Sequence, residues 1–284
     1  MKNVYSLNVN GRLMQLDRPK VMGILNLTPD SFYAGSRADN EEEVTRRVKQ
    51  LIADGADVID VGACSTRPGS AEVSVADEMN RLRRGLTTIL NVAPDAILSV
   101  DTYRADVAAM CVEEFGVSII NDVSGGDADS RMFDVVARNN VPYVLTHSMR
   151  TPHGDGVTGA FSIEGMLRSL GSKIEHLHEK GVKDVVIDPG FGFGKSLEDN
   201  YLLMNHLEEL HLLNHPLLVG VSRKSMIYHL LGIMPEDSLC ATTALHALVL
   251  TKGVHLLRVH DVKECCQCIR IFQAFTQKKK CNVN

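Results

Sequence analysis

Polar side chains recur along this chain, each at or directly after the end of a short apolar run. They are Asn26, Asp60, Asp101, Asn121, Thr146, His147, Asp188, Arg223, Lys224, Arg258 and His260. A single Asp or Asn after a strand often caps the next helix, so no one position carries the argument. As a set, the carboxylates and amides suit a ligand that offers N–H donors, and the Lys and Arg side chains suit an anionic group on that ligand.

Two short basic segments lie among these positions. Residues 65–69 (STRPG) place Arg67 next to a Pro-Gly turn, and residues 222–225 (SRKS) place Arg223 and Lys224 ahead of an apolar segment. Either segment alone could equally be a solvated turn. Because the loops after strands seven and eight of a (β/α)8 barrel often bind phosphate, we expect both segments to face an anionic group.

The glycine-rich stretch GFGFGKS (190–196) superficially resembles two nucleotide-binding signatures. A P-loop would need glycine at Pro189, and a dinucleotide fingerprint would need glycine at Lys195, so neither motif is present. We expect the glycines to let the backbone approach a ligand next to Asp188. Phe191 or Phe193 would then pack on that ligand.

The seven cysteines do not form a metal-binding or disulfide pattern. Cys265, Cys266 and Cys268 fall in the last predicted helix, without a second pair at the spacing of a zinc site. An odd, scattered set is typical of a reducing compartment. We therefore expect structural cysteines in a cytoplasmic protein.

Eight apolar runs must position the polar residues. They span residues 21–27, 57–62, 96–101, 118–123, 142–147, 184–188, 216–222 and 254–260, with amphipathic helical patterns between them. Runs that are apolar on both faces indicate parallel strands covered on both sides. Eight such units in about 250 residues predict a closed (β/α)8 TIM barrel, with a doubly wound open sheet as the alternative.

The N-terminal residues predict a short hairpin before the barrel. Its strands would lie near Tyr5–Val9 and Leu13–Leu16, around an Asn10-Gly11 turn. No Gly-, Ser- or Pro-rich linker divides the chain, so residues 1–284 are predicted to form a single domain.

Composition excludes some classes of partner. The formal net charge is −5, and no block of five like charges occurs, which argues against a nucleic-acid partner. No apolar run approaches the roughly 20 residues that a membrane-spanning helix needs. Small-molecule substrates remain the expected partners.

Seven motifs follow one another along nearly the whole chain. They are GILNLTPDSF (23–32), DVGACSTRPG (60–69), SVDT (99–102), INDVSG (120–125), DPGFGFGK (188–195), GVSRKS (220–225) and RVHD (258–261). In this order they resemble the successive loop signatures of the dihydropteroate synthases. The resemblance implies that hydroxymethyl-dihydropterin pyrophosphate and para-aminobenzoate condense to dihydropteroate and pyrophosphate in folate biosynthesis. It also implies Mg²⁺ as cofactor, competition by sulfonamides and a homodimer.

The resemblance assigns a role to each matching residue. The pterin-binding set would be Asp101, Asn121, Asp188, Phe193, Lys224 and Arg258. The pyrophosphate-binding set would be Asn26, Thr66, Arg67, Arg258 and His260, with Asn26 also a metal ligand. The para-aminobenzoate pocket would contain Phe32, Pro68, Arg223 and Ser225. The groups acting directly in catalysis would be Lys224, Arg67, Arg258 and His260.

The expected chemistry needs neither a strong base nor a covalent nucleophile. Cations and a metal would neutralise the charge that develops on the leaving pyrophosphate. The aromatic amine is already neutral and nucleophilic at pH 7, so Cys64 need not react. Ala34 stands where many relatives carry a loop carboxylate near the metal, so we expect magnesium binding to depend on the substrate.

Two rival functions share part of this residue set. A pterin-binding methyltransferase domain would keep the Asp and Asn residues at the strand ends, but it would not need SRKS or STRPG. A catalytically silent pterin-binding paralogue would lose the pyrophosphate residues, whereas Asn26, Arg67, Lys224 and His260 are all present. The sequence therefore favours the synthase.

Overall fold

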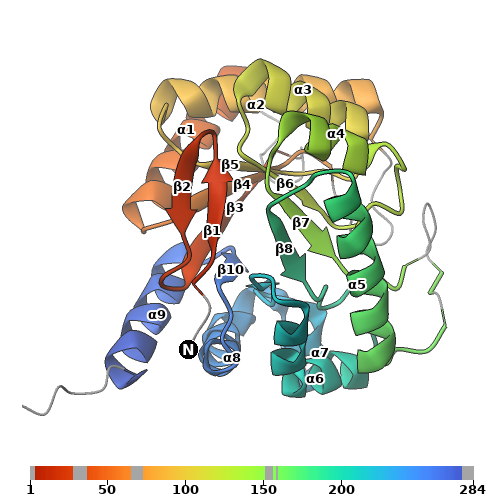
Figure 1. Cartoon of the computed structure of the whole chain (residues 1–284). Coiled ribbons are helices and arrows are strands. Elements are labelled where there is room, and N and C mark those ends of the chain that lie inside the picture. Colours follow the sequence, from red (N-terminus) through yellow and green to blue (C-terminus); the bar gives the residue numbers. More distant parts are fainter. Residues whose placement is uncertain (1–3, 28–36, 65–72, 151–155, 158, 277–284) are drawn as a thin grey trace, which may run out of the picture.

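Eight parallel strands form a ring in the computed structural model, which describes residues 4–27, 37–64, 73–150, 156–157 and 159–276, without the side chains of 37–40 (Figure 1). The strands are β3 (Lys20–Asn26), β4 (Val58–Gly62), β5 (Leu98–Asp101), β6 (Ile119–Asp122), β7 (Tyr143–Thr146), β8 (Val185–Asp188), β9 (Leu218–Val219) and β10 (Leu256–Val259). They pair in the order β8-β7-β6-β5-β4-β3-β10-β9. A parallel bridge between Ile187 and Leu217 joins the two ends of this order. The predicted (β/α)8 barrel is confirmed, and the open sheet is excluded.

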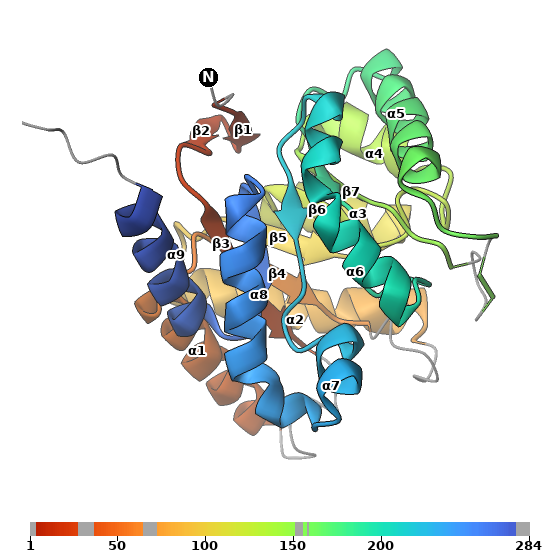
Figure 2. The same ribbon diagram turned by 90° about the horizontal axis from the view of Figure 1, so that it is seen from below.

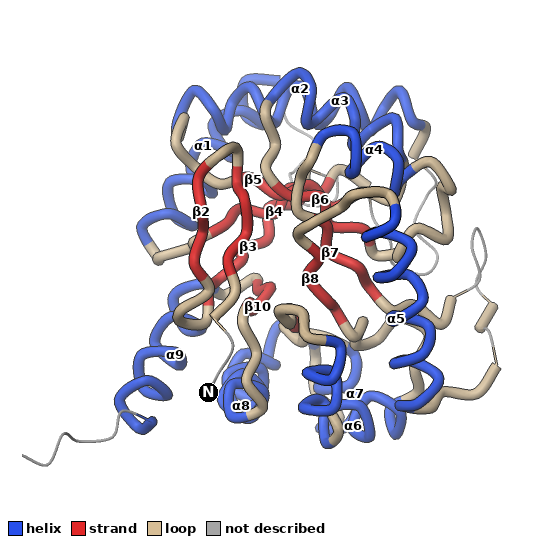
Figure 3. The backbone as a smooth tube through the Cα atoms, viewed as in Figure 1, coloured by secondary structure: helices blue, strands red, loops and turns tan. Residues whose placement is uncertain are grey.

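Helices connect the strands and surround the ring (Figure 3). They are α1 (Arg37–Ala53), α2 (Val75–Val92), α3 (Ala105–Phe115), α4 (Met132–Asn139), α5 (Ile163–Glu179), α6 (Leu197–Asn205), α7 (Ser225–Leu231), α8 (Leu239–Thr251) and α9 (Val262–Thr276), with 3-10 turns η2 (Leu207–Leu213) and η3 (Pro235–Ser238). Ser74, Ser162 and Ser196 begin helices by accepting a backbone N–H at their side-chain oxygens. Such local signals explain why the chain alternates between strand and helix.

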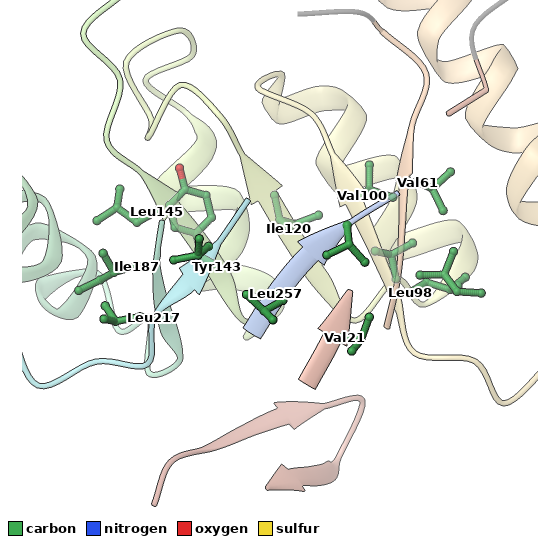
Figure 4. Packing of buried hydrophobic residues seen from close by; sticks show 14 of the residues in the cluster. Val21, Val61, Leu98, Val100, Ile120, Tyr143, Leu145, Ile187, Leu217 and Leu257 are labelled. Atoms are coloured by element: carbon green, nitrogen blue, oxygen red, sulfur yellow. The ribbon is translucent and has the colours of Figure 1, made fainter. Parts of the chain in front are cut away.

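Alternation along each strand divides the barrel side chains into two sets. One set faces the helices and includes Val61, Val100, Ile120, Leu145, Ile187 and Leu257, all buried in one large hydrophobic cluster (Figure 4). Because side chains alternate with a period of two, the residues between them point into the barrel. A strand can therefore keep its outward positions apolar while one of its inward positions carries a polar group.

The N-terminal hairpin closes one end of the barrel. Its strands are β1 (Ser6–Val9) and β2 (Arg12–Gln15), which pair antiparallel around Asn10 and Gly11, both with positive φ. The buried hairpin residues are Leu7, Val9, Met14 and Leu16, and they cluster with Met22, Val58, Ile119, Val144, Val186, Leu218 and Leu256 from the strands. Figure 2 shows the hairpin at one end of the barrel. The predicted hairpin is confirmed, and it forms an apolar plug.

Each predicted strand run overlaps one strand of the barrel, but one of these strands is much shorter than expected. The run 216–222 contains only the two residues of β9, because a turn closed by the bond from Lys224 N–H to the Val221 carbonyl follows it. Cys265, Cys266 and Cys268 lie in the last described helix, as predicted. No helix in the described part of the chain is long and apolar enough to cross a membrane.

Candidate active site

A polar layer lies above the apolar plug, inside the barrel. Each member stands two residues after a plug residue on the same strand, so both point inward: Asp60 after Val58, Asn121 after Ile119, Thr146 after Val144, Asp188 after Val186 and Arg258 after Leu256. Asp60, Asn121, Thr146 and Asp188 are all buried. Because side chains on a strand alternate with a period of two, these polar residues from different strands all point inward near the C-terminal end of the barrel.

Arg258 of β10 binds carboxylates from two other strands, β4 and β5. Its Nε donates to Asp60 Oδ2 at 2.6 Å, and its Nη2 donates to Asp101 Oδ2 at 2.6 Å. Asn121 Nδ2 donates to the same Asp60 oxygen at 3.0 Å. Charge-assisted bonds of this kind fix a guanidinium plane, so Arg258 presents a flat cationic surface to the mouth of the barrel.

Two carboxylates in or next to the layer, Asp101 and Asp188, have perturbed pKa values. Burial raises the pKa of Asp101 to about 7, and the Arg258 guanidinium opposes this rise. Burial also raises the pKa of Asp188, and the Lys224 ammonium opposes it. One Asp188 oxygen accepts the Gly190 N–H at 2.8 Å. Such shifts are typical of binding and catalytic sites.

Lys224 lies at the edge of the same cluster. Its Nζ donates to the Phe191 carbonyl at 2.6 Å and lies 4.8 Å from the centre of the Phe193 ring. Burial lowers the pKa of Lys224 to about 8, while Asp188 opposes the shift. The Lys224 ammonium therefore loses its proton only slightly above neutral pH.

The glycine-rich loop approaches a neighbouring strand end. Gly190 has φ of 68°, and a Cβ there would lie 2.1 Å from the carbonyl oxygen of His147. Gly194, with φ of 71°, likewise leaves no room beside Met149. At these two positions the glycines allow a close approach to the chain after β7, and the expected approach of the loop to a ligand stays a prediction. Phe191 is fully buried in the outer core, which leaves Phe193 as the aromatic ring beside Lys224.

Several buried polar atoms of the layer have no hydrogen-bond partner among the described residues. They are Asp60 Oδ1, Ser99 Oγ, Asn121 Oδ1 and Thr146 Oγ1. A buried polar atom without a partner is costly, by about 1–3 kcal/mol. The layer therefore has acceptors to offer to a ligand rich in N–H groups.

A second group of side chains lies one step further along the strands. Asn26, Gly62 and Asp101 are neighbours in register on β3, β4 and β5. His260 follows β10, and its Nδ1 lies 3.1 Å from Ser222 Oγ. Gly62 has no side chain, and a Cβ there would contact Asn26 Oδ1 at 3.5 Å and the Asp101 side chain at 3.6 Å, so the Asn26 and Asp101 side chains both lie beside Gly62.

Comparison with known proteins agrees with this geometry. The family model of pterin binding enzymes matches residues 22–260. Dihydropteroate synthase of Bacillus subtilis (strain 168) is 38% identical over 264 residues, which cover 92% of this chain and 90% of that protein. The chain belongs to the dihydropteroate synthases.

Solved structures of the family share the fold. The dihydropteroate synthase of Xanthomonas albilineans with 4-aminobenzoic acid has a TM-score of 0.87 and 37% identity, covering 97% of this chain and 100% of that one. The same enzyme in complex with 7,8-dihydropteroate has a TM-score of 0.84 and 36% identity, covering 96% and 100%. The barrel and its N-terminal hairpin are thus those of a dihydropteroate synthase.

The structure brings most of the family-assigned residues to one end of the barrel. Those found at or next to the C-terminal ends of the strands are Asn26, Asp101, Asn121, Asp188, Phe193, Lys224, Arg258 and His260. Phe32, Thr66, Arg67, Pro68 and Ala34 lie outside the described residues.

Two residues assigned to the aminobenzoate pocket follow β9. Arg223 adopts φ of 52°, a left-handed conformation, and its guanidinium forms two bonds of 2.9 Å with Asp261. It also donates to the Pro235 and Glu236 carbonyls. Ser225 is the first residue of α7. Their role in binding aminobenzoate stays a prediction.

The family resemblance gave two residues of the site no individual role. Asp60, which the sequence placed among the polar residues at strand ends, is fully buried and anchors both Arg258 and Asn121. Its two-residue offset from Val58 is the same as that of Asp188 from Val186. Lys195 is also buried, and its Nζ donates to the His147 and Gly190 carbonyls at 3.0 and 2.8 Å. No sequence signal distinguishes this lysine from an exposed one.

Proposed function

We propose that the chain condenses 6-hydroxymethyl-7,8-dihydropterin pyrophosphate with para-aminobenzoate, giving 7,8-dihydropteroate and pyrophosphate. The observation that carries the proposal is the polar layer, in which Arg258 lies between Asp60 and Asp101. The Xanthomonas albilineans enzyme is known with 4-aminobenzoic acid and with 7,8-dihydropteroate. Both ligands are those expected from the reaction.

The pterin would occupy the mouth of the barrel above the polar layer. Asp188 and Asn121 would pair with the amino-pyrimidine edge, since carboxylate and amide oxygens accept the N–H groups there. Asp101 and Lys224 would complete the set at the ring nitrogens. Arg258 and Phe193 would lie against the ring. Asp60, which the family pattern did not assign, would hold Arg258 and Asn121 in place.

The pyrophosphate would lie at Asn26, Thr66, Arg67, Arg258 and His260. Breaking the bond between the pterin methylene carbon and the pyrophosphate oxygen leaves the electron pair on that oxygen. Cationic side chains stabilise this developing charge more than they stabilise the ground state. The amine nitrogen of para-aminobenzoate then forms the new bond to the carbon and releases its proton. Its pocket would include Phe32, Pro68, Arg223 and Ser225.

Asn26 Oδ1 beside Gly62 is an oxygen donor of the kind that Mg²⁺ binds. A Cβ at Gly62 would lie 3.5 Å from this oxygen and 4.0 Å from Asp101 Oδ2, but Asp101 Oδ2 already accepts Arg258 Nη2 at 2.6 Å. Within the described ranges, no cluster of three or more His, Cys, Asp or Glu could hold a metal. Magnesium commonly binds through one or two protein oxygens, substrate phosphates and water. When bound, it would help to neutralise the leaving pyrophosphate.

We also propose a cytoplasmic homodimer that sulfonamides inhibit at the aminobenzoate site. The exposed face of α8 consists of Cys240, Ala244, Ala247, Leu248 and Thr251, and the helix contains no Asp, Glu, Lys or Arg. Leu230, Leu231 and Met234 are also exposed on the adjoining segment. An uncharged helix face of this kind favours burial against a second copy.

A product assay tests the reaction directly. Purified protein is incubated with both substrates and magnesium, and dihydropteroate and pyrophosphate are measured. Equal amounts of the two products are expected. A protein that binds the pterin but forms neither product would be the silent paralogue. Methyl transfer from a methylated pterin to a corrinoid protein would support the rival methyltransferase.

A further inference from the structure

Two adjacent pairs of residues join the chain after β9 to the chain after β10. Arg223 makes two hydrogen bonds of 2.9 Å to the Asp261 carboxylate. Ser222, which precedes Arg223, contacts His260, which precedes Asp261. An arginine that bonds a carboxylate through two nitrogens has a well-defined geometry. The ion pair therefore keeps Ser222 and His260 beside each other.

The Ser222 hydroxyl makes both of its contacts with the same histidine. Its Oγ accepts the backbone N–H of His260 at 3.2 Å and lies 3.1 Å from the ring nitrogen Nδ1. Ser222 is only 4% exposed, so water has little access to the hydroxyl. Among the described residues, Nδ1 is the one acceptor in reach of the hydroxyl proton.

The direction of the contact at Nδ1 decides which ring nitrogen carries the proton. If Ser222 donates to Nδ1, the hydroxyl proton has an acceptor, and the proton of the neutral imidazole lies on Nε2. If Nδ1 donated instead, the Ser222 oxygen would accept two hydrogen bonds, and its own proton would be buried without an acceptor in the described chain. Because an unpaired buried donor is costly, Ser222 favours the Nε2–H form.

The position of His260 relates this tautomer to the proposed pyrophosphate site. Arg258 points into the barrel two residues after Leu256 of the apolar plug. His260 comes two residues later, directly after β10, so the same alternation directs its ring to the mouth. A protonated Nε2 can donate to a phosphate oxygen, whereas an unprotonated Nε2 would repel that oxygen.

We infer that Ser222 is a positioning residue, which holds the His260 imidazole with its proton on Nε2 so that the ring donates to an oxygen of the pyrophosphate. The inference deepens the proposed function and rests on it. The family resemblance gave Ser222 no role, and the inference assigns it no contact with the substrate. Ser222 should therefore affect binding of the leaving group only through His260.

The tautomer is measured by NMR on the wild-type protein without ligand. Long-range ¹H–¹⁵N spectra distinguish a protonated ring nitrogen from an unprotonated one, and the His260 signals are those absent from His260→Ala. At a pH where the ring is neutral, the proton should lie on Nε2. The Nδ1 signal should shift in Ser222→Ala, because the variant removes the hydrogen bond to Nδ1. A proton on Nδ1, or an Nδ1 signal that is the same in Ser222→Ala, would overturn the inference.

A double-mutant cycle tests whether Ser222 acts through His260. Calorimetry measures the affinity for inorganic pyrophosphate, with magnesium present, in the wild type, Ser222→Ala, His260→Ala and the double variant. Ser222→Ala should weaken binding by about five- to tenfold, which is the effect of one hydrogen bond. In the His260→Ala background the same change should alter affinity by about twofold or less. Equal losses in the two backgrounds would give Ser222 a role independent of His260 and contradict the inference.

Ser118 provides a matched control for the loss of a buried serine hydroxyl. It is also 4% exposed, and its Oγ accepts Asn10 Nδ2 at 2.9 Å, but it precedes β6 at the other end of the barrel. Ser118→Ala should keep pyrophosphate affinity within about twofold of wild type. If the wild type forms no dihydropteroate and binds no pyrophosphate, the proposed function fails, whereas the NMR spectra still decide the tautomer of His260.

Discussion

Asp188 is buried at the end of β8, with one oxygen bound to Gly190 N–H and the other available at the mouth. We predict that Asp188→Ala nearly abolishes pterin binding. The substitution leaves donors of the ligand unpaired in a buried place, at about 1–3 kcal/mol or more. Calorimetry with the pterin measures this loss, and a thermal unfolding curve verifies that the variant is folded. Unchanged affinity in a folded variant would remove Asp188 from the pterin site.

The ionisable pair Asp101 and Lys224 predicts a narrow pH optimum. Burial raises the pKa of Asp101 to about 7, so below that pH the carboxyl is protonated and accepts N–H groups poorly. Burial lowers the pKa of Lys224 to about 8, so above that pH the positive charge is lost. Hence kcat/KM for the pterin substrate should rise through about pH 7 and fall through about pH 8.

Two substitutions assign the limbs of this profile. Asp101→Asn should remove the low-pH limb, and Lys224→Arg should move the high-pH limb upward because arginine stays protonated. Both should lower the maximum. A profile whose limbs persist in both variants would mean that other groups titrate.

We predict that magnesium binding at Asn26 depends on the substrate. Among the described residues beside Gly62, Asn26 offers one neutral amide oxygen, and the nearby Asp101 oxygen already accepts Arg258 Nη2, so there is too little charge to retain magnesium alone. Calorimetric titration should show weak magnesium binding to the free protein and tighter binding with saturating pyrophosphate. Asn26→Leu should reduce only the second value. Tight binding to the free wild-type protein would require a metal ligand outside this set.

At the scale of elements, we predict that substitutions in the N-terminal hairpin change the stability of the fold and leave catalysis unchanged. Leu7 of β1 is 1% exposed in the apolar plug, whereas Leu13 of β2 is 71% exposed. Leu7→Ala should lower the free energy of unfolding by about 2–5 kcal/mol, because it leaves a cavity in the plug. Leu13→Ala should change it by about 0.5 kcal/mol or less.

Both hairpin variants should retain the KM values of the wild type at temperatures where they are folded. The plug lies at the N-terminal end of the barrel, and the polar layer lies beyond it. Chemical denaturation and steady-state kinetics on the same preparations test the separation. A KM that changes with Leu7→Ala would show that the hairpin influences the mouth.

At the scale of the whole molecule, the uncharged face of α8 predicts a homodimer. Leu248 on α8 and Ile271 on α9 are 55% and 72% exposed. Leu248→Lys should weaken the dimer, because a charge would be buried at the interface, while Ile271→Lys should not. Sedimentation velocity over a range of concentrations measures the dissociation. A monomeric wild type would contradict the proposal.

We further propose that residues 1–284 form a single domain. The plug connects the hairpin to seven of the eight strands through one apolar cluster. A closed core of this kind should unfold in one cooperative transition. Coincident curves from circular dichroism and fluorescence would agree with it, whereas two separate transitions would indicate an independent unit.

The sequence by itself determined the architecture and most of the site. Eight apolar runs separated by capped helices are enough for a (β/α)8 barrel, because parallel strands need helical crossovers and burial on both faces. The same order predicted that Asp101, Asn121, Asp188 and Arg258 would meet, since strand ends share one end of such a barrel. These are local and periodic properties, which a single chain displays directly.

Only the tertiary structure decided which side chains touch. The pairing of Arg258 with Asp60 joins residues 198 positions apart, and that of Glu78 with Arg104 joins α2 to the start of α3. The glycines at 190 and 194 fit against the chain after β7, which no local pattern indicated. Burial and contact across the barrel set these pairs and their pKa values, because both depend on how the strands and loops close in space.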